Sequence, residues 1–394
     1  MYQRKQYQTI TERLNEHRKF IQVLAGPRQV GKSTLIAQVL KDINTPYSSL
    51  SSEDTPNATN AWISDIWEEV RTKMSIRHEE EHLLVIDEIQ KIDNWSETVK
   101  KEWDRDTRER RNIKVVLLGS SRLLLKKGLT ESLAGRFEMI RLGHWSYKEM
   151  SDAFGLTTDE YVYFGGYPGT ADLIHDEERW QTYVRDSLVE SAITKDVLLT
   201  TTINKPSLLR RLFELGCQYS SRELSLTKMM GELQEKGNVT TLANYLHLLD
   251  ECNLLTGLQK YAGDTARKYN STPKFQVYNN ALLNYRNANG FAEERKDPKK
   301  WGRQVESAIG GHLINNADLY GYRVYYWRNR NDEVDFILEK GGNLCALEVK
   351  SGRRTTNSGM TKFRQLFSPQ YALAIGTGGI PIEEFLTLDV RELL

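Results

Sequence analysis

The sequence has few of the residues that mark secreted, membrane-spanning or disordered proteins. Its 394 residues include only nine prolines and three cysteines, Cys217, Cys252 and Cys345. Cysteines that are widely spaced and odd in number fit reduced thiols better than a disulfide framework, and none has a nearby histidine as a zinc site would require. No apolar run approaches the roughly 20 residues of a membrane-spanning helix. We therefore expect a cytoplasmic protein with no membrane partner.

An excess of charge of either sign is also missing. The chain has 54 Lys and Arg against 53 Asp and Glu, a formal net charge of +1. This balance gives no overall basic field that attracts nucleic acid, so any DNA site must be local. Single hydrophobic cores stop growing at roughly 250–300 residues, so a chain of this length predicts several domains.

Residues 26–33 match the phosphate-binding pattern G-x-x-x-x-G-K-S/T. They follow an apolar, strand-like segment, residues 20–25, and precede a helical one, residues 32–41, which is the context that phosphate binding requires. Loop amides and the helix N-terminus attract phosphates, while Lys32 reaches the β- and γ-phosphates and Ser33 binds Mg²⁺. The predicted ATP-binding residues are Gly26, Pro27, Arg28, Gln29, Val30, Gly31, Lys32, Ser33 and Thr34.

Two further apolar segments end in polar residues. Residues 83–86 precede Asp87 and Glu88, and residues 113–118 precede Gly119, Ser120 and Ser121. Strands that alternate with helices form a parallel sheet, whose carboxyl ends meet at the ligand-binding edge. We expect Asp87 to bind Mg²⁺ either directly, with Ser33, or in the second shell, and Glu88 to polarise the attacking water. Ser120 or Ser121 is the candidate sensor of the γ-phosphate.

Arg136 lies in the segment Ser-Leu-Ala-Gly-Arg-Phe, residues 132–137. From chemistry alone it is either an arginine finger that reaches a neighbouring subunit's γ-phosphate or an ordinary surface arginine or helix cap. An arginine finger is worth roughly 10³–10⁵ in rate.

The order of these motifs resembles a prokaryotic family of AAA-type ATPases, itself similar to the archaeal-type ATPases, with a C-terminal domain of unknown function. The resemblance covers nearly the whole chain and rests on Gly-Pro-Arg-Gln-Val-Gly-Lys-Ser, Leu-Val-Ile-Asp-Glu-Ile-Gln, Leu-Leu-Gly-Ser-Ser, Ser-Leu-Ala-Gly-Arg and Phe-Gly-Gly-Tyr-Pro. It implies that Arg136 holds the arginine-finger position and hence that the active form is a homo-oligomer, for example a ring. The segment 165–168 is distinctive for the family, without an assigned chemical role. Many members have an aspartate where this chain has Asn279-Asn280.

A second group of acids lies near the C-terminus. Residues 331–338 and 344–350 predict a hairpin across Gly341-Gly342 that places Glu348 and Lys350 on one strand face, with Asp335 alongside. The pattern resembles the PD-(D/E)xK nuclease fold, with Glu306 as its helical acid. Asp335, Glu348 and Glu306 would bind Mg²⁺, and Lys350 would support the nucleophile. A salt-bridged hairpin and a nuclease-like fold that does not cleave are the alternatives.

We therefore predict an α/β multidomain protein with four parts: a P-loop AAA-type ATPase domain (1–150), a helical lid (151–205), a winged-helix-like module (206–295) and a PD-(D/E)xK nuclease-like domain (296–394). The winged-helix-like module presents Thr240, Thr241, Asn244 and His247 on one helix. This face is polar but not basic, so it is a poor solitary DNA reader and a scaffold role is at least as well supported.

The leading functional prediction is a DNA-associated ATPase that uses ATP and Mg²⁺ and has metal-dependent nuclease capacity. One alternative is an ATP-regulated switch or assembly protein whose C-terminal domain never cuts. Another is a regulator, linked to a transposon or toxin, that acts on protein partners.

Overall fold

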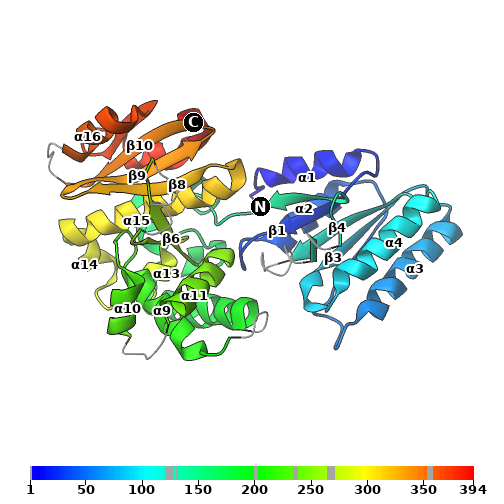
Figure 1. Cartoon of the computed structure of the whole chain (residues 1–394). Coiled ribbons are helices and arrows are strands. Elements are labelled where there is room, and N and C mark those ends of the chain that lie inside the picture. Colours follow the sequence, from blue (N-terminus) through cyan, green and yellow to red (C-terminus); the bar gives the residue numbers. More distant parts are fainter. Residues whose placement is uncertain are drawn as a thin grey trace. The chain divides into compact units, whose positions relative to one another are not determined.

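The computed structural model describes residues 2–119, 128–129, 132–198, 203–233, 238–263, 271–352 and 358–394. The chain forms two compact units, Met1–Leu142 and Gly143–Leu394, which we call unit 1 and unit 2 (Figure 1). The three cysteines are buried and free, as the sequence predicts. None of the described helices is both long enough and apolar enough to span a membrane.

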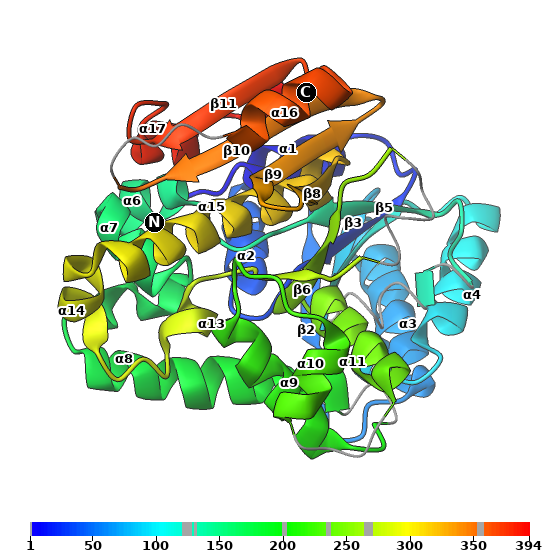
Figure 2. The ribbon, with the colours of Figure 1, turned by 60° about the vertical axis from the view of Figure 1, so that its left-hand side comes forward.

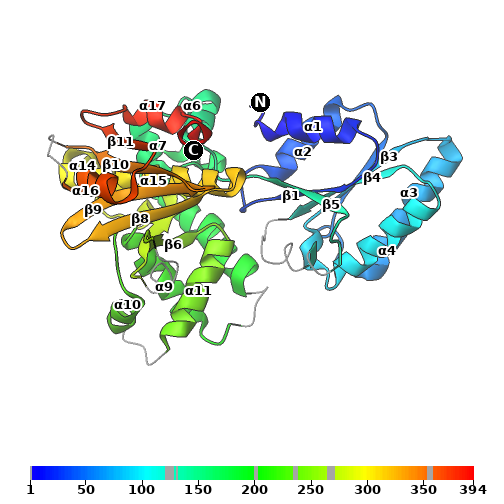
Figure 3. The ribbon, with the colours of Figure 1, turned by 45° about the horizontal axis from the view of Figure 1, so that its top comes forward.

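Unit 1 is built on a sheet of five parallel strands in the order β2-β3-β4-β1-β5. Every residue of β1 and β4 is buried, as expected for a parallel sheet covered on both faces. Helices α1 and α2 cover one face, and α3 and α4 cover the other (Figures 1 and 3). The predicted parallel α/β domain is therefore confirmed. Its elements are α1 (Gln6–Asn15), β1 (Ile21–Ala25), α2 (Lys32–Asp42), β2 (Tyr47–Ser51), α3 (Asn60–Arg77), β3 (His82–Asp87), η1 (Ile89–Lys91), α4 (Trp95–Arg108), β4 (Ile113–Gly119) and β5 (Phe137–Arg141).

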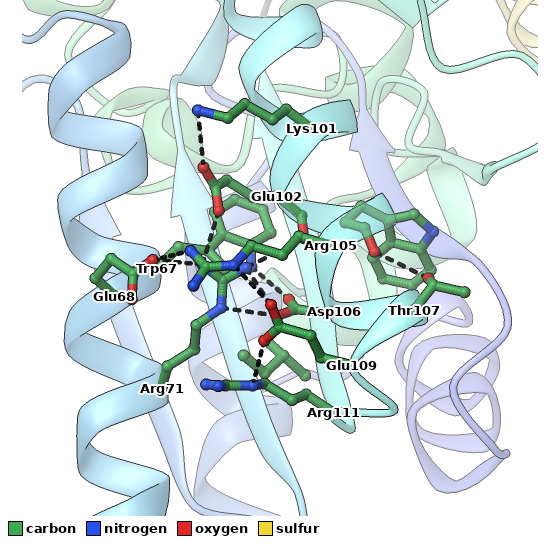
Figure 4. Close-up of polar contacts among 12 residues, drawn as sticks. Trp67, Glu68, Arg71, Lys101, Glu102, Arg105, Asp106, Thr107, Glu109 and Arg111 are labelled. Atoms are coloured by element: carbon green, nitrogen blue, oxygen red, sulfur yellow. Dashed lines mark hydrogen bonds and ion pairs between the residues drawn. The ribbon is translucent and has the colours of Figure 1, made fainter.

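A buried ion cluster joins α3 to α4 (Figure 4). Arg71 donates to Glu102 at 2.7 Å and to Asp106 at 2.8 Å, and Trp67 Nε1 donates to the second Asp106 oxygen at 2.8 Å. Arg71 and Glu102 are each 3% exposed, and Asp106 is fully buried. Burial raises the pKa of Asp106, and the hydrogen bonds from Trp67 and Arg71 offset this only in part. The charges are paired inside the unit, so their contribution depends on every partner being present.

Unit 2 begins with helices that lead into a three-helix group. The helices before its sheet are α6 (Tyr147–Phe154), α7 (Thr158–Phe164), η2 (Pro168–Leu173), α8 (Glu177–Tyr183), η3 (Val184–Val189), η4 (Ala192–Leu198), α9 (Pro206–Gln218), α10 (Leu226–Glu232) and α11 (Val239–Glu251). The buried face of α11 consists of Leu242, Tyr245, Leu246 and Leu249, at helical spacing. The antiparallel pair β6 (Leu255–Lys260) and β7 (Lys274–Val277) follows. The winged-helix interpretation of residues 206–295 stays a prediction.

The hairpin of β6 and β7 is part of a larger mixed sheet. Its six strands have the order β11-β10-β9-β8-β6-β7, because β6 also pairs in parallel with β8. The strands of the predicted winged-helix-like module and of the predicted C-terminal domain therefore share one sheet. The remaining elements are α13 (Ala281–Asn284), α14 (Gly290–Lys296), α15 (Pro298–Tyr320), β8 (Arg323–Asn329), β9 (Asp332–Lys340), β10 (Asn343–Lys350), α16 (Ser358–Phe367), β11 (Tyr371–Gly376), α17 (Ile382–Thr387) and η5 (Val390–Leu393).

Helices α15 and α16 lie on opposite faces of this sheet (Figures 1 and 2). Phe363 of α16 joins a core cluster with Tyr325, Trp327 and Ile337 of the strands. On the other face Gly310 of α15 lies so close to Phe336 that an added Cβ would be 2.9 Å from the ring. The glycine lets α15 approach the sheet closely.

The segment 165–168, which has no predicted chemical role, has a structural one. Gly166 N donates to Asn279 Oδ1 at 3.1 Å, and Ala281 N donates to the same oxygen at 3.1 Å. Gly165 has a φ of 75°, and a Cβ there would be 1.9 Å from Asn279 Oδ1. Only glycine permits this approach. The segment therefore docks the helices of residues 147–183 onto the turn after β7.

Candidate functional site

The phosphate-binding loop connects β1 to α2, as the motif predicts. A Cβ on Gly26 would be 2.2 Å from the carbonyl oxygen of Leu142, so the first loop position must be glycine. Gly31 has a φ of 87° and precedes the first residue of α2. Lys32 is buried, and its Nζ donates to the carbonyl oxygens of Gly26 at 3.0 Å and Pro27 at 2.8 Å. The lysine is thus held inside its own loop.

Arg4 is a supporting residue that the sequence does not point to. It is 5% exposed, and its Nη1 donates to the carbonyl oxygen of Val30 in the loop at 3.3 Å. No motif contains it, because it lies 26 residues before its partner.

Ser33 and Asp87, the two predicted Mg²⁺ ligands of unit 1, are in contact. Ser33 Oγ donates to Asp87 Oδ2 at 2.7 Å, and Asp87 Oδ1 accepts the backbone N–H of Glu88 at 2.8 Å. Strand β4 lies between β1 and β3, so the last residue of β3 reaches across it to the first turn of α2. The parallel sheet brings these two residues, which are 54 positions apart in the sequence, to the carboxyl ends of its strands.

Glu88, the predicted base, lies beside the phosphate loop in a restrained position. Its φ is 51°, in the left-handed region that non-glycine residues seldom adopt. Gln90 Nε2 donates to Glu88 Oε2 at 2.6 Å, Arg28 Nη2 is 3.9 Å from the same oxygen, and Ser52 Oγ donates to the Glu88 carbonyl at 2.7 Å. Unusual backbone conformations that the surroundings impose cluster at functional sites. Gln90 was not predicted, although it lies in the Asp-Glu-Ile-Gln motif.

The predicted sensors Ser120 and Ser121 lie outside the described residues. The last described residue before them, Gly119, ends β4 and pairs with Ala25, the last residue of β1.

Arg136 lies near the amino ends of the parallel strands, whereas the phosphate loop lies at their carboxyl ends. It immediately precedes β5, and Phe137 pairs with Ile21 at the amino end of β1, whereas Ala25 and the loop are at the carboxyl end. Five residues of strand separate the two edges by roughly 16 Å. Arg136 binds Asp104 of α4 through Nε at 2.8 Å and Nη2 at 3.0 Å, and this pairing lowers the pKa of Asp104. The arginine therefore cannot reach the nucleotide edge of its own chain in this arrangement.

The nucleotide edge fits a magnesium-bound nucleotide by its donor set. Mg²⁺ prefers oxygen ligands and is usually held by one or two protein groups together with phosphates. Ser33 and Asp87 offer a hydroxyl and a carboxylate, 2.7 Å apart, at the start of α2. The helix N-terminus and the loop amides add the positive potential that phosphates require.

The C-terminal acids lie on the strands that the sequence predicts. Leu347 of β10 pairs with Phe336 of β9, so Glu348 and Asp335 occupy the next step of the antiparallel register. Asp335 Oδ2 accepts the backbone N–H of Val349 at 2.7 Å. Lys350 is the last residue of β10, two residues after Glu348.

A lysine from β7 enters this acidic group. Lys274 Nζ donates to Glu306 Oε1 at 2.6 Å and to the carbonyl oxygen of Asp335 at 3.2 Å, and it is 3.9 Å from Asp335 Oδ1. Burial lowers the pKa of Lys274, but Glu306 and Asp335 outweigh it, so the net shift is upward. Burial, with the Glu306 charge, raises the pKa of Asp335 to about 7. Sequence inspection missed Lys274, because the topology of the sheet alone brings it to these acids.

The arrangement around Lys274 does not fit a divalent cation between Glu306 and Asp335. In the part of the chain that the structure describes, no three His, Cys, Asp or Glu side chains come together as a ligand set. The space between the two carboxylates holds an ammonium group instead. We derive no reaction step through a metal ion at this position.

The fold and edge of unit 1 define a P-loop nucleotide-binding domain, and the comparison with protein families gives its type. Residues 18–151 match the model of the AAA domain family. This match, together with the P-loop and the parallel sheet, supports an AAA-type domain in unit 1. Residues 156–293 match a domain of unknown function (DUF8612), and residues 301–389 match another (DUF4143).

Relatives are found in bacteria and archaea. An uncharacterized protein of Mycobacterium tuberculosis is 25% identical over 342 residues, 85% of this chain and 71% of the relative. An uncharacterized protein of Haemophilus influenzae is 23% identical over 350 residues, 84% of this chain and 82% of the relative. One from Methanocaldococcus jannaschii is 23% identical over 338 residues, 81% of this chain and 72% of the relative.

Among solved structures, the Thermotoga maritima RuvB Holliday junction branch migration motor matches with a TM-score of 0.35 and 17% identity, covering 64% of this chain and 85% of RuvB. The Aeropyrum pernix ORC1 protein in complex with DNA matches with a TM-score of 0.33 and 12% identity, covering 69% of this chain and 88% of ORC1. TM-scores this low do not establish a shared overall fold.

Proposed function

We propose that this protein hydrolyses ATP with Mg²⁺ at the carboxyl edge of the unit 1 sheet. The observation that carries the proposal is the contact of 2.7 Å between Ser33 Oγ and Asp87 Oδ2. It joins the hydroxyl of the phosphate loop to the acid of the neighbouring strand edge, with Glu88 next in the chain. A chance glycine-rich turn would have no reason to meet an acid in this way.

The residues of the loop have separable tasks in binding. Loop amides and the α2 N-terminus receive the phosphate oxygens. Lys32 exchanges the carbonyl oxygens of Gly26 and Pro27 for phosphate oxygens, since charge-assisted hydrogen bonds are roughly twice as strong as those between neutral groups. Ser33 and Asp87 hold Mg²⁺, whose charge offsets the negative charge that develops on the phosphates.

Glu88 orients the attacking water, because phosphoryl transfer depends on positioning and electrostatics more than on covalent chemistry. Its carboxylate is steadied by Gln90 at 2.6 Å and faces Arg28 at 3.9 Å. Arg28 belongs to the phosphate loop, so nucleotide binding and the position of the base are linked through one side chain.

The test compares three full-length variants. Lys32→Ala should lose ATP binding and phosphate release. Glu88→Gln should bind ATP like the wild type but release little phosphate, because the amide cannot act as a base. Lys41→Ala, an exposed lysine on the same helix, is the matched control and should behave as wild type. Undiminished phosphate release by Lys32→Ala or Glu88→Gln would refute the proposal.

We further propose DNA as a partner of unit 2. Thr240, Asn244 and His247 are exposed on α11, opposite its buried apolar face, and Arg330 is exposed at the turn between β8 and β9. Polar side chains on one helix suit a groove, but the bulk of DNA affinity comes from phosphate contacts. Binding of labelled duplex at two salt concentrations tests this, and affinity that is absent at low salt would exclude it.

Two functions remain for the C-terminal part, metal-dependent cleavage and binding without cleavage. The position of Lys274 between Glu306 and Asp335 favours the second. Supercoiled plasmid with ATP and Mg²⁺ or Mn²⁺ separates them, using wild type, Lys32→Ala and Lys350→Ala. Nicking that Lys350→Ala abolishes supports a nuclease, and an intact plasmid under every condition supports an ATP-regulated binding protein.

We also propose that Arg136 acts between subunits of a homo-oligomer. Arg136 lies one strand length from the nucleotide edge of its own chain, so a catalytic role requires the nucleotide of a neighbouring chain and the release of Arg136 from Asp104. Mixing inactive Arg136→Ala with inactive Glu88→Gln should restore phosphate release, because some interfaces then combine an intact base with an intact arginine. An absence of rescue in a mixture that still oligomerises would contradict a shared site.

A further inference from the structure

Lys274 is a buried lysine in the described part of unit 2, and it lies between the acids Glu306 and Asp335. It is 6% exposed, and its Nζ lies over the ring of Phe336, 4.7 Å from the ring centroid. Glu306 and Asp335 contribute a carboxylate oxygen at 2.6 Å, a carbonyl oxygen at 3.2 Å and a second carboxylate oxygen at 3.9 Å. A buried ammonium requires such compensation.

The acids are committed to this arrangement. One Asp335 oxygen faces Lys274, and the other accepts the N–H of Val349 at 2.7 Å, which ties β9 to β10. Glu306 comes from α15, Asp335 from β9 and Lys274 from β7. The ammonium therefore links α15 and β9 to β7. A metal ion that entered between the carboxylates would have to expel a buried, charged lysine.

The geometry around the ammonium also differs from that of a metal centre. Mg²⁺ demands near-octahedral oxygen ligands at roughly 2.0–2.1 Å and keeps several waters. The pair of carboxylates around Lys274 has no third acidic ligand within the described residues.

We propose that the Lys274 ammonium is the resident cation of unit 2, taking the place of a divalent metal ion between Glu306 and Asp335, so that the domain neither binds nor needs a metal there. The inference rests on the second function proposed for the C-terminal part, binding without cleavage. It is independent of ATP hydrolysis, because its test contains no nucleotide.

The experiment uses the full chain with Asp87→Asn, which removes the acidic ligand of the nucleotide edge. Titration with Mn²⁺, followed by the electron paramagnetic resonance of free Mn²⁺, counts bound ions. The parent should bind none tightly. Lys274→Met keeps the length and apolar stem of the side chain but exposes two carboxylates to each other, so it should gain about one Mn²⁺ per chain. Lys340→Met, an exposed lysine in β9, is the matched control and should gain none.

Thermal unfolding gives a second readout. Lys274→Met should unfold at a lower temperature than the parent in chelator and recover when Mn²⁺ is added, and adding Glu306→Gln should abolish both the bound ion and the recovery. A folded Lys274→Met variant that gains no Mn²⁺ overturns the proposal. If that variant does not fold, the parent decides: tight Mn²⁺ binding that Glu306→Gln removes would overturn the proposal, and its absence would support it.

Discussion

Replacing Arg71 by methionine should destabilise unit 1 strongly without touching the nucleotide edge. Arg71 is the shared partner of Glu102 and Asp106, which are 3% and 0% exposed. Removing one partner of a buried ion pair costs about 3–5 kcal/mol, because the remaining charge is left uncompensated. Total stabilities are about 5–15 kcal/mol, so this loss is a large fraction of the whole. At roughly 3 °C for each kcal/mol, the midpoint of unfolding should fall by about 10 °C.

The loss should also depend on pH. Burial already raises the pKa of Asp106, and without Arg71 the pKa of this carboxyl rises further. A carboxyl whose pKa is higher in the folded state keeps its proton more readily when folded, so it lowers the free energy of unfolding only above its unfolded-state pKa of about 3.9. This loss of free energy grows with pH until the pH passes the folded-state pKa. The destabilisation should therefore be larger at pH 8 than at pH 5.

The free energy of unfolding of unit 1 is measured by unfolding in guanidinium. Hydrogen exchange in peptides from α3 and α4 monitors the transition. Arg105→Ala is the control, because Arg105 contacts Glu68 and Glu109 in the same cluster but its side chain is 37% exposed (Figure 4). Surface ion pairs contribute little, so this control should lose much less. An equal loss in the two variants, or a loss at pH 5 that matches the loss at pH 8, would refute the reasoning.

Three other predictions concern the sites. Gln90→Ala should lower the rate of phosphate release while leaving ATP affinity unchanged, because Gln90 holds the base and not the phosphates; an unchanged rate would show that this contact is dispensable. Gly155→Ala should lower the free energy of unfolding by about 1–2 kcal/mol, because of left-handed backbone strain alone. Gly165→Ala should lower it by at least twice as much, because its added Cβ also overlaps Asn279. Equal losses of the two variants in chemical unfolding would contradict this. Asp335 has a folded-state pKa of about 7, so unit 2 should lose stability as the pH rises from about 4 to 7, and Asp335→Asn should flatten this slope in unfolding measured across that range.

The nucleotide edge could be predicted from sequence because its signals are local. Gly26, Gly31, Lys32 and Ser33 belong to one loop whose spacing the chemistry fixes, and Asp87 follows an apolar run that marks a buried strand. The parallel sheet then places these segments at one edge without further information. The position of Lys32 follows from the motif. Its contacts with the carbonyl oxygens of Gly26 and Pro27 follow from its burial.

The C-terminal contacts could be predicted only in part. The hairpin of β9 and β10 has a regular two-residue period, so the proximity of Asp335 and Glu348 follows from its register. Lys274 lies 32 residues from Glu306 and 61 from Asp335, in a strand that the sequence assigns to another module. Its role depends on β6 pairing with both β7 and β8, a long-range choice that no local pattern encodes.

The two acidic groups of the chain differ in what holds them, and this difference bears on their function. At the nucleotide edge Asp87 meets a neutral hydroxyl, a group that can share a divalent cation with it and keep its place. In unit 2 Asp335 and Glu306 meet an ammonium, which a divalent cation must displace against repulsion between like charges. On these grounds we assign the proposed metal-dependent chemistry to unit 1. An ion that binds unit 2 only after Lys274 is replaced is the result that this argument requires.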